Sequence, residues 1–430
     1  MTRLLPLLLA ALLVAAFARP AGAVLSIDIR QGVRDPLPVA LVPFAWEGEG
    51  ARPFDVAGVV TADLKRSGLF RFIGEGAFIS RPHTPEGVTY KDWRLVGADA
   101  LVIGRMRPAA DGKVEVRFRL FDVYSQRQIT GVRYVVEPGG LRDVGHRIAD
   151  AIHRELIGWS GAFNSRLAYV VKEGERFRLM VADADGANAR SVLTSRQPIL
   201  SPAWAPGGDR LAYVSFEQGR SMVYLQDLAT GKRSTLAAFD GLNSAPDFSP
   251  DGDKLALALS KDGNPELYVL DLASRQLRRL TRHGAIDTEP SWGPEGERLI
   301  FTSDRGGSPQ LYRVAASGGE VTRLTFEGRY NAAPSWSPTG ERVAFVHGDG
   351  NRFAIAVLDL ESGSTRTLTG LGPNESPSFA PNGRMILYAT QAAGGAGELA
   401  TVSVDGSVQQ RLQRERAGDV REPAWSPMAE

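Results

Sequence analysis

The sequence predicts two domains: a small α/β N-terminal domain followed by an all-β six-bladed β-propeller. Three observations support this fold class: a repeat with a step of about 44 residues, an abundance of turn residues, and an N-terminal part without the repeat. The 47 Gly and 26 Pro residues would interrupt helical repeats of this length, but they suit short strands joined by turns. With 430 residues, 43% of them hydrophobic, the chain can bury the cores of two domains.

The repeat is centred on a motif of proline, any residue, an aromatic residue, a small residue and proline. It occurs at residues 202–206, 246–250, 290–294, 334–338, 377–381 and 423–427. The steps between the first prolines are 44, 44, 44, 43 and 46 residues, which is the length of a four-stranded propeller blade. A turn and an alternating apolar strand follow each motif but the last, so the aromatic residues are expected between blades.

The order of the strands indicates a closed ring. A strand of the second type, residues 166–170, precedes every motif, whereas the last motif, at Trp425, has no strand after it. The C-terminal strand can therefore supply the innermost strand that the first blade lacks. An open solenoid is the alternative, and it would leave sheet edges exposed. We expect the propeller to span residues 165–430.

The residues before the repeat predict the α/β domain, over 24–157. Apolar periodicity favours strands at 39–44, 100–104, 113–123 and 128–136, and helices at 55–67 and 141–157. Residues 158–164 form the expected linker.

Residues 1–23 predict a secretory signal peptide. Arg3 is followed by an apolar run at 4–17 and by the small-x-small cleavage pattern at 21–23. The run is shorter than the ~20 residues of a spanning helix, which disfavours the alternative of an uncleaved membrane anchor. The chain has no cysteine, which excludes a lipoprotein signal, disulfides and thiolate metal sites. We therefore expect an exported protein without direct membrane insertion.

The search for catalytic and ligand-binding patterns predicts no catalytic residue, no cofactor and no metal. The sequence contains no HExxH, P-loop, Rossmann or GxSxG pattern, and His146 and His153 lie too far apart for the i, i+4 pair of a metal site. Acidic residues recur in the predicted turns, where they suit hairpin chemistry; a calcium ion in the central channel is left open and not predicted. The formal net charge of +1 argues against nucleic acid as a partner.

These residues together resemble the TolB family, the periplasmic propellers of the Tol–Pal cell-envelope system. The matching landmarks are residues 42–44, 62–70, 157–158, 200–204, 264–272, 287–290, 301–304 and 423–427. The resemblance implies a non-enzymatic periplasmic scaffold that links Pal and TolA and supports outer-membrane integrity and envelope constriction during cell division. It also implies outer-membrane proteins and colicins as further partners. The chain departs from the family at Glu422, where an aromatic residue is common, and at Leu242, where a polar residue is common.

A hydrolase or carbohydrate-binding propeller of the periplasm is the alternative function. Propellers of this repeat type also precede serine peptidase domains, but here no nucleophile motif is present and the last motif leaves no room for a hydrolase. A panel of peptidase and glycosidase assays would discriminate between the two functions.

Two binding sites are predicted. Strand direction alternates within a blade, so the loops that enter the innermost strands lie opposite the turns such as 250–252. The linker enters before Arg166, which places the N-terminal domain on the turn face and leaves the other face open. The predicted Pal-binding residues on that open face are Asn243, Ser244, Ala245, Asp287, Thr288, Glu289, Asn331, Glu375 and Glu422; residues 243–245 and 288–289 resemble the family's Pal-contacting loops.

The second site is a TolA-binding strand at the mature N-terminus. The segment is short and alternating, and it precedes the first firm element, so it can add to the sheet edge of a partner. The predicted residues are Val24, Leu25, Ser26, Ile27, Asp28, Ile29 and Arg30. The alternative is an ordinary edge strand of its own domain.

Overall fold

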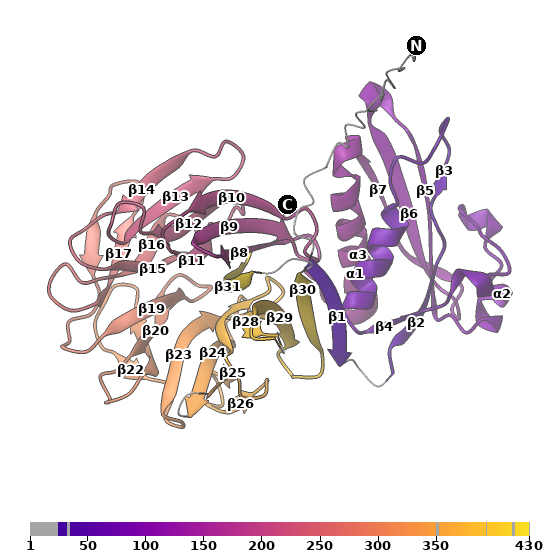
Figure 1. Ribbon diagram of the computed structural model, residues 1–430. Helices are drawn as coiled ribbons and strands as arrows, with labels where there is room; N and C mark the ends of the chain where they lie inside the picture. Colours follow the sequence, from indigo (N-terminus) through magenta and orange to yellow (C-terminus); the bar gives the residue numbers. More distant parts are fainter. Residues whose placement is uncertain (1–24, 32–34, 350–351, 393, 415–417, 430) are drawn as a thin grey trace, which may run out of the picture.

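The computed structural model describes residues 25–31, 35–349, 352–392, 394–414 and 418–429. It confirms the predicted fold class, with a mixed α/β domain beside a ring of six antiparallel blades (Figure 1). Among the described residues, no helix is both long enough and apolar enough to cross a membrane. The predicted signal peptide, 1–23, lies outside the described residues.

The N-terminal domain is built on one sheet with the order β4-β2-β5-β6-β7, in which β3 also pairs with β5. The strands are β2 Leu37–Leu41, β3 Ala45–Trp46, β4 Phe70–Phe72, β5 Ala100–Pro108, β6 Val114–Asp122 and β7 Arg127–Val136. The helices are α1 Val56–Arg66, α2 Tyr90–Leu95 and α3 Leu141–Ile157, with single 3-10 turns at Glu75–Ala77, Pro85–Gly87, Ala110–Gly112 and Pro138–Gly140.

Helices α1 and α3 cover one face of this sheet and separate it from the propeller (Figure 1). The apolar residues of α3 recur at steps of four, and Val144, Ile148 and Ile152 are all buried against the sheet. The helix ends at Gly158, which adopts a left-handed C-cap with φ of 97°. The short helix α2 covers only part of the opposite face, where Trp93 is buried.

Each blade pairs its strands in an antiparallel ladder. The first blade holds β8 Arg166–Glu173, β9 Arg176–Asp183 and β10 Arg190–Ser195, and the second holds β11 Ile199–Trp204, β12 Arg210–Ser215, β13 Met222–Asp227 and β14 Arg233–Ala237. The third holds β15 Asn243–Phe248, β16 Lys254–Leu259, β17 Glu266–Asp271 and β18 Leu277–Arg279, and the fourth β19 Asp287–Trp292, β20 Arg298–Ser303, β21 Gln310–Ala315 and β22 Thr322–Arg323. The fifth holds β23 Tyr330–Trp336, β24 Arg342–Asp349, β25 Arg352–Asp359 and β26 Thr365–Thr367, and the sixth β27 Glu375–Phe379, β28 Met385–Gln391, β29 Gly397–Ser403 and β30 Gln409–Arg414.

The C-terminal strand β31, Asp419–Trp425, completes the first blade. It pairs antiparallel with β8, with Trp425 opposite Leu167, so the predicted closure of the ring is confirmed. The motif aromatics lie between blades as expected. For example, Trp204 packs between the first two blades and donates a hydrogen bond from Nε1 to the carbonyl of Ala424 over 3.1 Å.

The N-terminal strand β1, Leu25–Gln31, departs from the expected division of the chain. It pairs antiparallel with β30 and forms a fifth, outermost strand of the sixth blade rather than part of the N-terminal sheet. The outer strand of the sixth blade, β30, has an edge whose backbone groups can pair with any strand of suitable length. Because this edge lies next to the N-terminal domain (Figure 1), β1 can reach it. The other proposed domain boundaries remain predictions.

Candidate functional site

A cavity of about 610 Å³ lies where the innermost strands of the six blades meet. It is lined by the repeated motif itself, at residues 201–204, 245–247, 289–291, 333–335, 376–379 and 422–426. The motif therefore serves two purposes, because its aromatic residues fill the space between blades and its smaller residues surround the channel.

A ring of left-handed residues encircles this channel. In every blade the residue directly before the first motif proline has a φ between 47° and 53°, and the strand carries a bulge at that point. The six residues of this bulge ring are Ser201, Ala245, Glu289, Ala333, Ser376 and Glu422. Such a conformation is costly for residues other than glycine, and a bulge re-aims the side chains beside it, here toward the channel.

The two glutamates of the bulge ring also join neighbouring blades. Glu289 accepts a hydrogen bond from the backbone N–H of Ala333 over 2.8 Å, and Glu422 accepts one from Ser201 over 3.1 Å. Burial, together with the charges of Glu375 and Glu289, raises the pKa of Glu422 to about 7. The hydrogen bond from the backbone of Ser201 acts in the other direction but does not outweigh them. Near neutral pH the mouth of the channel is thus less negative than its carboxylates suggest.

Three of the predicted Pal-binding residues have structural roles. Asn243, Asp287 and Asn331 are fully buried at the starts of β15, β19 and β23. Asn243 donates to the carbonyl of Phe239 over 2.7 Å, and Asp287 accepts from the guanidinium of Arg305 over 2.7 and 2.9 Å. These side chains hold the loops in shape, and we expect them to influence a partner only through those loops.

The remaining predicted residues are accessible to different degrees. Glu375 is exposed, whereas Ser244, Ala245, Thr288, Glu289 and Glu422 are half-buried. The structure thus brings all nine predicted residues to one end of the channel, with six of them open to a partner.

Sequence reasoning missed four exposed apolar side chains on the same face. They lie in or shortly before the innermost strands of four different blades: Leu200 is 37% exposed, Ile286 49%, Phe326 73% and Leu371 47%. These four, named here the apolar rim, are the only exposed large hydrophobic residues that the described part of the propeller carries. They do not share one position relative to the motif prolines, so the repeat gave no signal for them beyond large apolar side chains in or just before the innermost strands.

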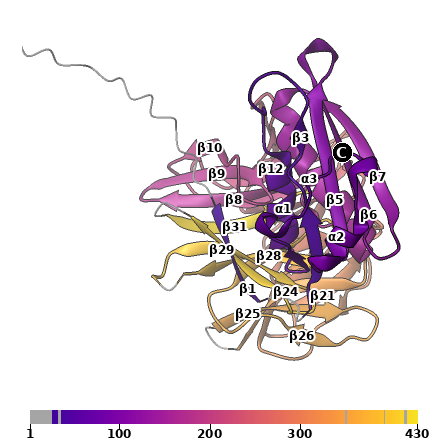
Figure 2. The same cartoon turned by 90° about the vertical axis from the view of Figure 1, so that its right-hand side faces the viewer.

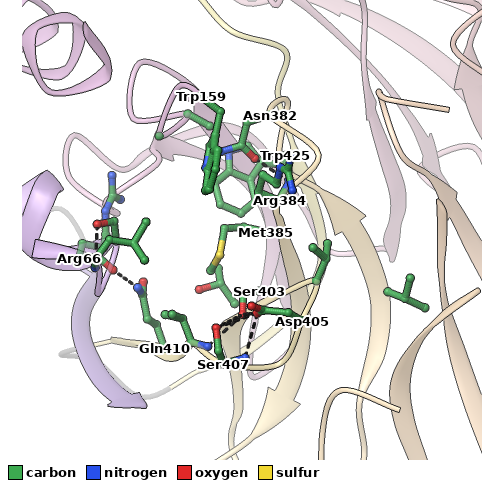
Figure 3. Close-up of a pocket in the computed structure, with 18 of the residues that line it drawn as sticks. Arg66, Trp159, Asn382, Arg384, Met385, Ser403, Asp405, Ser407, Gln410 and Trp425 are labelled. Carbon is green, nitrogen blue, oxygen red and sulfur yellow. Dashed lines mark hydrogen bonds between the residues drawn. The ribbon is translucent and has the colours of Figure 1, made fainter. Parts of the chain in front are cut away.

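The N-terminal domain occupies the opposite, turn face. Asn382, in the turn before β28, donates to the carbonyl of Ser160 over 2.9 Å, and Arg384 lies over the ring of Trp159 at 4.7 Å. A second cavity of about 420 Å³ lies between the domains, and Figure 3 shows Trp159, Met385 and Trp425 along one side of it. The predicted position of the N-terminal domain therefore agrees with these contacts.

An ion network also crosses the domain interface. Arg142 of α3 pairs with Asp183, over 3.0 Å, and with Asp185 of the first blade. Within the N-terminal domain, Asp63 contacts Arg66 over 3.0 Å and the imidazole Nδ1 of His146 over 2.5 Å.

Asp63, His146 and Asp185 are the single group among the described residues whose ligand atoms, all within 4.8 Å, have the spacing of a metal site. Their carboxylates, however, already contact arginine or histidine. The arrangement therefore favours an ion network over a metal centre. Its cations are Arg66, Arg142 and His146, and its carboxylates are Asp63, Asp183 and Asp185.

Comparison with known proteins gives a consistent picture. The model of the TolB amino-terminal domain matches residues 25–129, and that of the TolB beta propeller domain matches residues 153–429. The chain is 59% identical to the Tol-Pal system protein TolB of Thioalkalivibrio sulfidiphilus over 98% of this chain and 99% of that protein. It is 60% identical to that of Nitrosococcus oceani over 94% of each. The crystal structure of TolB from Acinetobacter baumannii is similar with a TM-score of 0.85 and 40% identity, over 94% of this chain and 100% of that one.

Proposed function

Because the chain belongs to the TolB family of Tol-Pal system proteins, we propose that it is a non-enzymatic periplasmic scaffold that links Pal to TolA. In this role it supports outer-membrane integrity and envelope constriction during division. Colicins and outer-membrane proteins are further proposed partners.

The apolar rim is the observation that carries the Pal assignment. All four side chains stand on one face of the propeller, in or just before the innermost strands of four blades, and apolar side chains around an open mouth favour a protein partner there. The rim surrounds the mouth where the predicted Pal residues lie. The N-terminal domain covers the other face and leaves this one open.

Large side chains at the mouth should block Pal. We expect Ala245→Trp and Thr288→Trp each to weaken Pal binding at least about tenfold, measured by isothermal titration calorimetry. Both positions are half-buried at the channel mouth, so the indole would stand in the path of the partner. The matched control is Glu295→Trp, an exposed position in a turn of the opposite face, which should bind Pal normally.

Removing the apolar rim is the second arm of this experiment. Ile286→Ser and Phe326→Ser delete exposed apolar surface, so we expect weaker Pal binding at an unchanged melting temperature. Normal binding by all four mouth variants, together with a loss in Glu295→Trp, would assign Pal to the other face.

The proposed TolA-binding strand coincides with β1. Among the described residues β1 is the last strand of its sheet and pairs only with β30, so its second edge has the backbone groups that could pair with a strand of TolA. Val24 lies outside the described residues, and the whole segment 24–30 is kept in the proposal.

Deleting residues 24–30 should abolish TolA binding while Pal binding persists. The deletion removes only the outermost strand of a blade whose other strands, β27 to β30, remain paired. Pull-down of the variant with each partner separately checks this prediction. Loss of both partners would point to misfolding, which circular dichroism would reveal, and retention of TolA would place its site elsewhere.

A further inference from the structure

The outer face of the N-terminal sheet, which points away from α1, α3 and the propeller, carries a concentration of positive charge. Arg105 and Arg107 of β5, Arg117 and Arg119 of β6, and Arg133 of β7 all project from this side, because residues directly opposite in a ladder share a face. We call these five residues the arginine face. Helix α2 covers only the other end of the same side, where Phe121 is buried.

Like charges meet directly across three strands of the arginine face. Arg105 lies opposite Arg117, and Arg117 lies opposite Arg133. Directly opposed like charges destabilise a sheet, so the row is held at a cost unless something compensates it. A row of this kind indicates an anionic partner.

The carboxylates nearby compensate the row only in part. Glu115 is almost completely buried and gives both oxygens to Arg107, over 3.0 and 3.1 Å, while Arg117 and Arg133 stand farther off at 3.8 and 3.5 Å. Glu47 pairs with Arg105 over 3.2 Å. Two carboxylates therefore contact four of the five guanidinium groups, and Arg133 is the most exposed of these four, at 56%.

Arg133 also stands at a free sheet edge. In the described part of the chain β7 is the last strand of its sheet and pairs only with β6, and Figure 2 shows it at the outer margin of the domain. Alternate backbone N–H and C=O groups of an edge strand lack sheet partners and can pair with an added strand. Ten residues, Arg127–Val136, are available for such pairing.

The neighbours of Arg133 define what an added strand should carry. On the arginine face it is flanked by Gly131, beside which the side chains of Arg119 and Gln128 lie, and by Val135, which is exposed and apolar. On the other face Val132 and Tyr134 are half-buried at the rim of the domain core, where apolar side chains would fit.

We propose that the free edge of β7 binds an extended segment of another protein by strand addition, with an acidic side chain opposite Arg133 and apolar side chains beside Val135, Val132 and Tyr134. A second copy of this chain is disfavoured as the occupant, since edge-to-edge pairing would bring two arginine faces together. The arginine row thus excludes self-association and selects an acidic strand by the same charge.

The probe is a fluorescein-labelled peptide of the length of β7, with alternating Thr and Val and one central Glu. We expect it to bind the protein in fluorescence anisotropy, and a peptide with Lys in place of the Glu to bind at least about tenfold more weakly. Arg133→Glu should reverse this preference. The matched control is Arg127→Glu, on the same strand but opposite Asp122 in the ladder and outside the arginine face, which should preserve it.

Hydrogen exchange distinguishes strand addition from simple charge attraction. The bound Glu peptide should slow the exchange of amides within 127–136, whereas attraction to the arginine face alone would leave these amides unchanged. The proposal fails if neither peptide binds at about 1 mM, if both bind equally, if Arg133→Glu has no effect, or if β7 gains no protection. Binding to phosphatidylglycerol vesicles, lost in Arg133→Glu while no peptide binds, would assign the face to a membrane instead.

Discussion

A chain that ends at Gly418 should lose the cooperative unfolding transition of its propeller. This truncation removes β31, the strand that closes the first blade against β8. It also removes Trp425, whose Nε1 donates to Ser165 over 2.8 Å, and Ser426, whose hydroxyl accepts from the backbone of Arg166. Trp425 is partly buried, but β31 also carries the buried residues Val420 and Ala424, so its removal exposes apolar surface along the whole length of β8.

Urea titration followed by tryptophan fluorescence measures this loss. We expect the truncated chain to unfold at a lower urea midpoint with a smaller slope, because the exposed edge of β8 lets the first blade open. The control is a chain ending at Met428, which keeps β31 but loses the two hydrogen bonds between Ala429 and Asn164. Its transition should stay cooperative. An unchanged midpoint and slope in the chain ending at Gly418 would contradict closure by β31.

Closure was predictable from sequence because it follows from counting. Each blade needs one strand that carries the proline motif, and the motif at Trp425 has no strand after it while the strand at 166–170 has no motif before it. The position of β1 did not follow from any such count. A short alternating strand fits every open edge, and only the packing of the two domains decides that β30 is its neighbour.

The buried polar residues at the mouth show what sequence reasoning about sites did not anticipate. Asn243, Asp287 and Asn331 were predicted as contact residues because they are polar and lie in loops, yet they are fully buried. They recur at the blade step of 44 residues, and Asn374 follows after 43 with a similar bond to the carbonyl of Phe353. Buried polar side chains that recur in this way at the step of the repeat serve the blade.

The ion network between the domains was beyond sequence reasoning for a different reason. Asp63, His146 and Asp185 lie far apart in the sequence and on three different elements, and only the docking of α1 and α3 on the first blade brings them together. His146 is 2% exposed and lies between carboxylates of both domains.

Charge on His146 should make the domain interface weaken as the pH rises. Burial opposes the imidazolium, but the hydrogen bond with Asp63 and the charges of Asp63 and Asp185 outweigh burial and raise the pKa of His146. A group whose pKa is raised by folding stabilises the protein fully when the pH is below its pKa in the unfolded chain, here about 6.5. It loses this contribution as the pH rises through its pKa in the folded protein.

The titration of Asp185 has the opposite pH dependence. Burial is outweighed there by the charges of Arg66, Arg142 and His146, which lower the pKa of Asp185. The contribution of Asp185 is therefore present above about pH 4 and is lost only in stronger acid.

Other groups titrate in the same range, so the test is a difference between two variants. Burial lowers the pKa of His153, which makes the protein less stable in acid, and burial raises that of Asp247 to about 7, which makes it less stable in base. Both effects cancel when the free energy of unfolding of His146→Gln is subtracted from that of the wild type at each pH. We expect this difference to be largest near pH 5–6 and to shrink as the pH rises to about 9. A difference that stays constant, or that grows with pH, would show that His146 is neutral and that the interface is held by Arg142 alone.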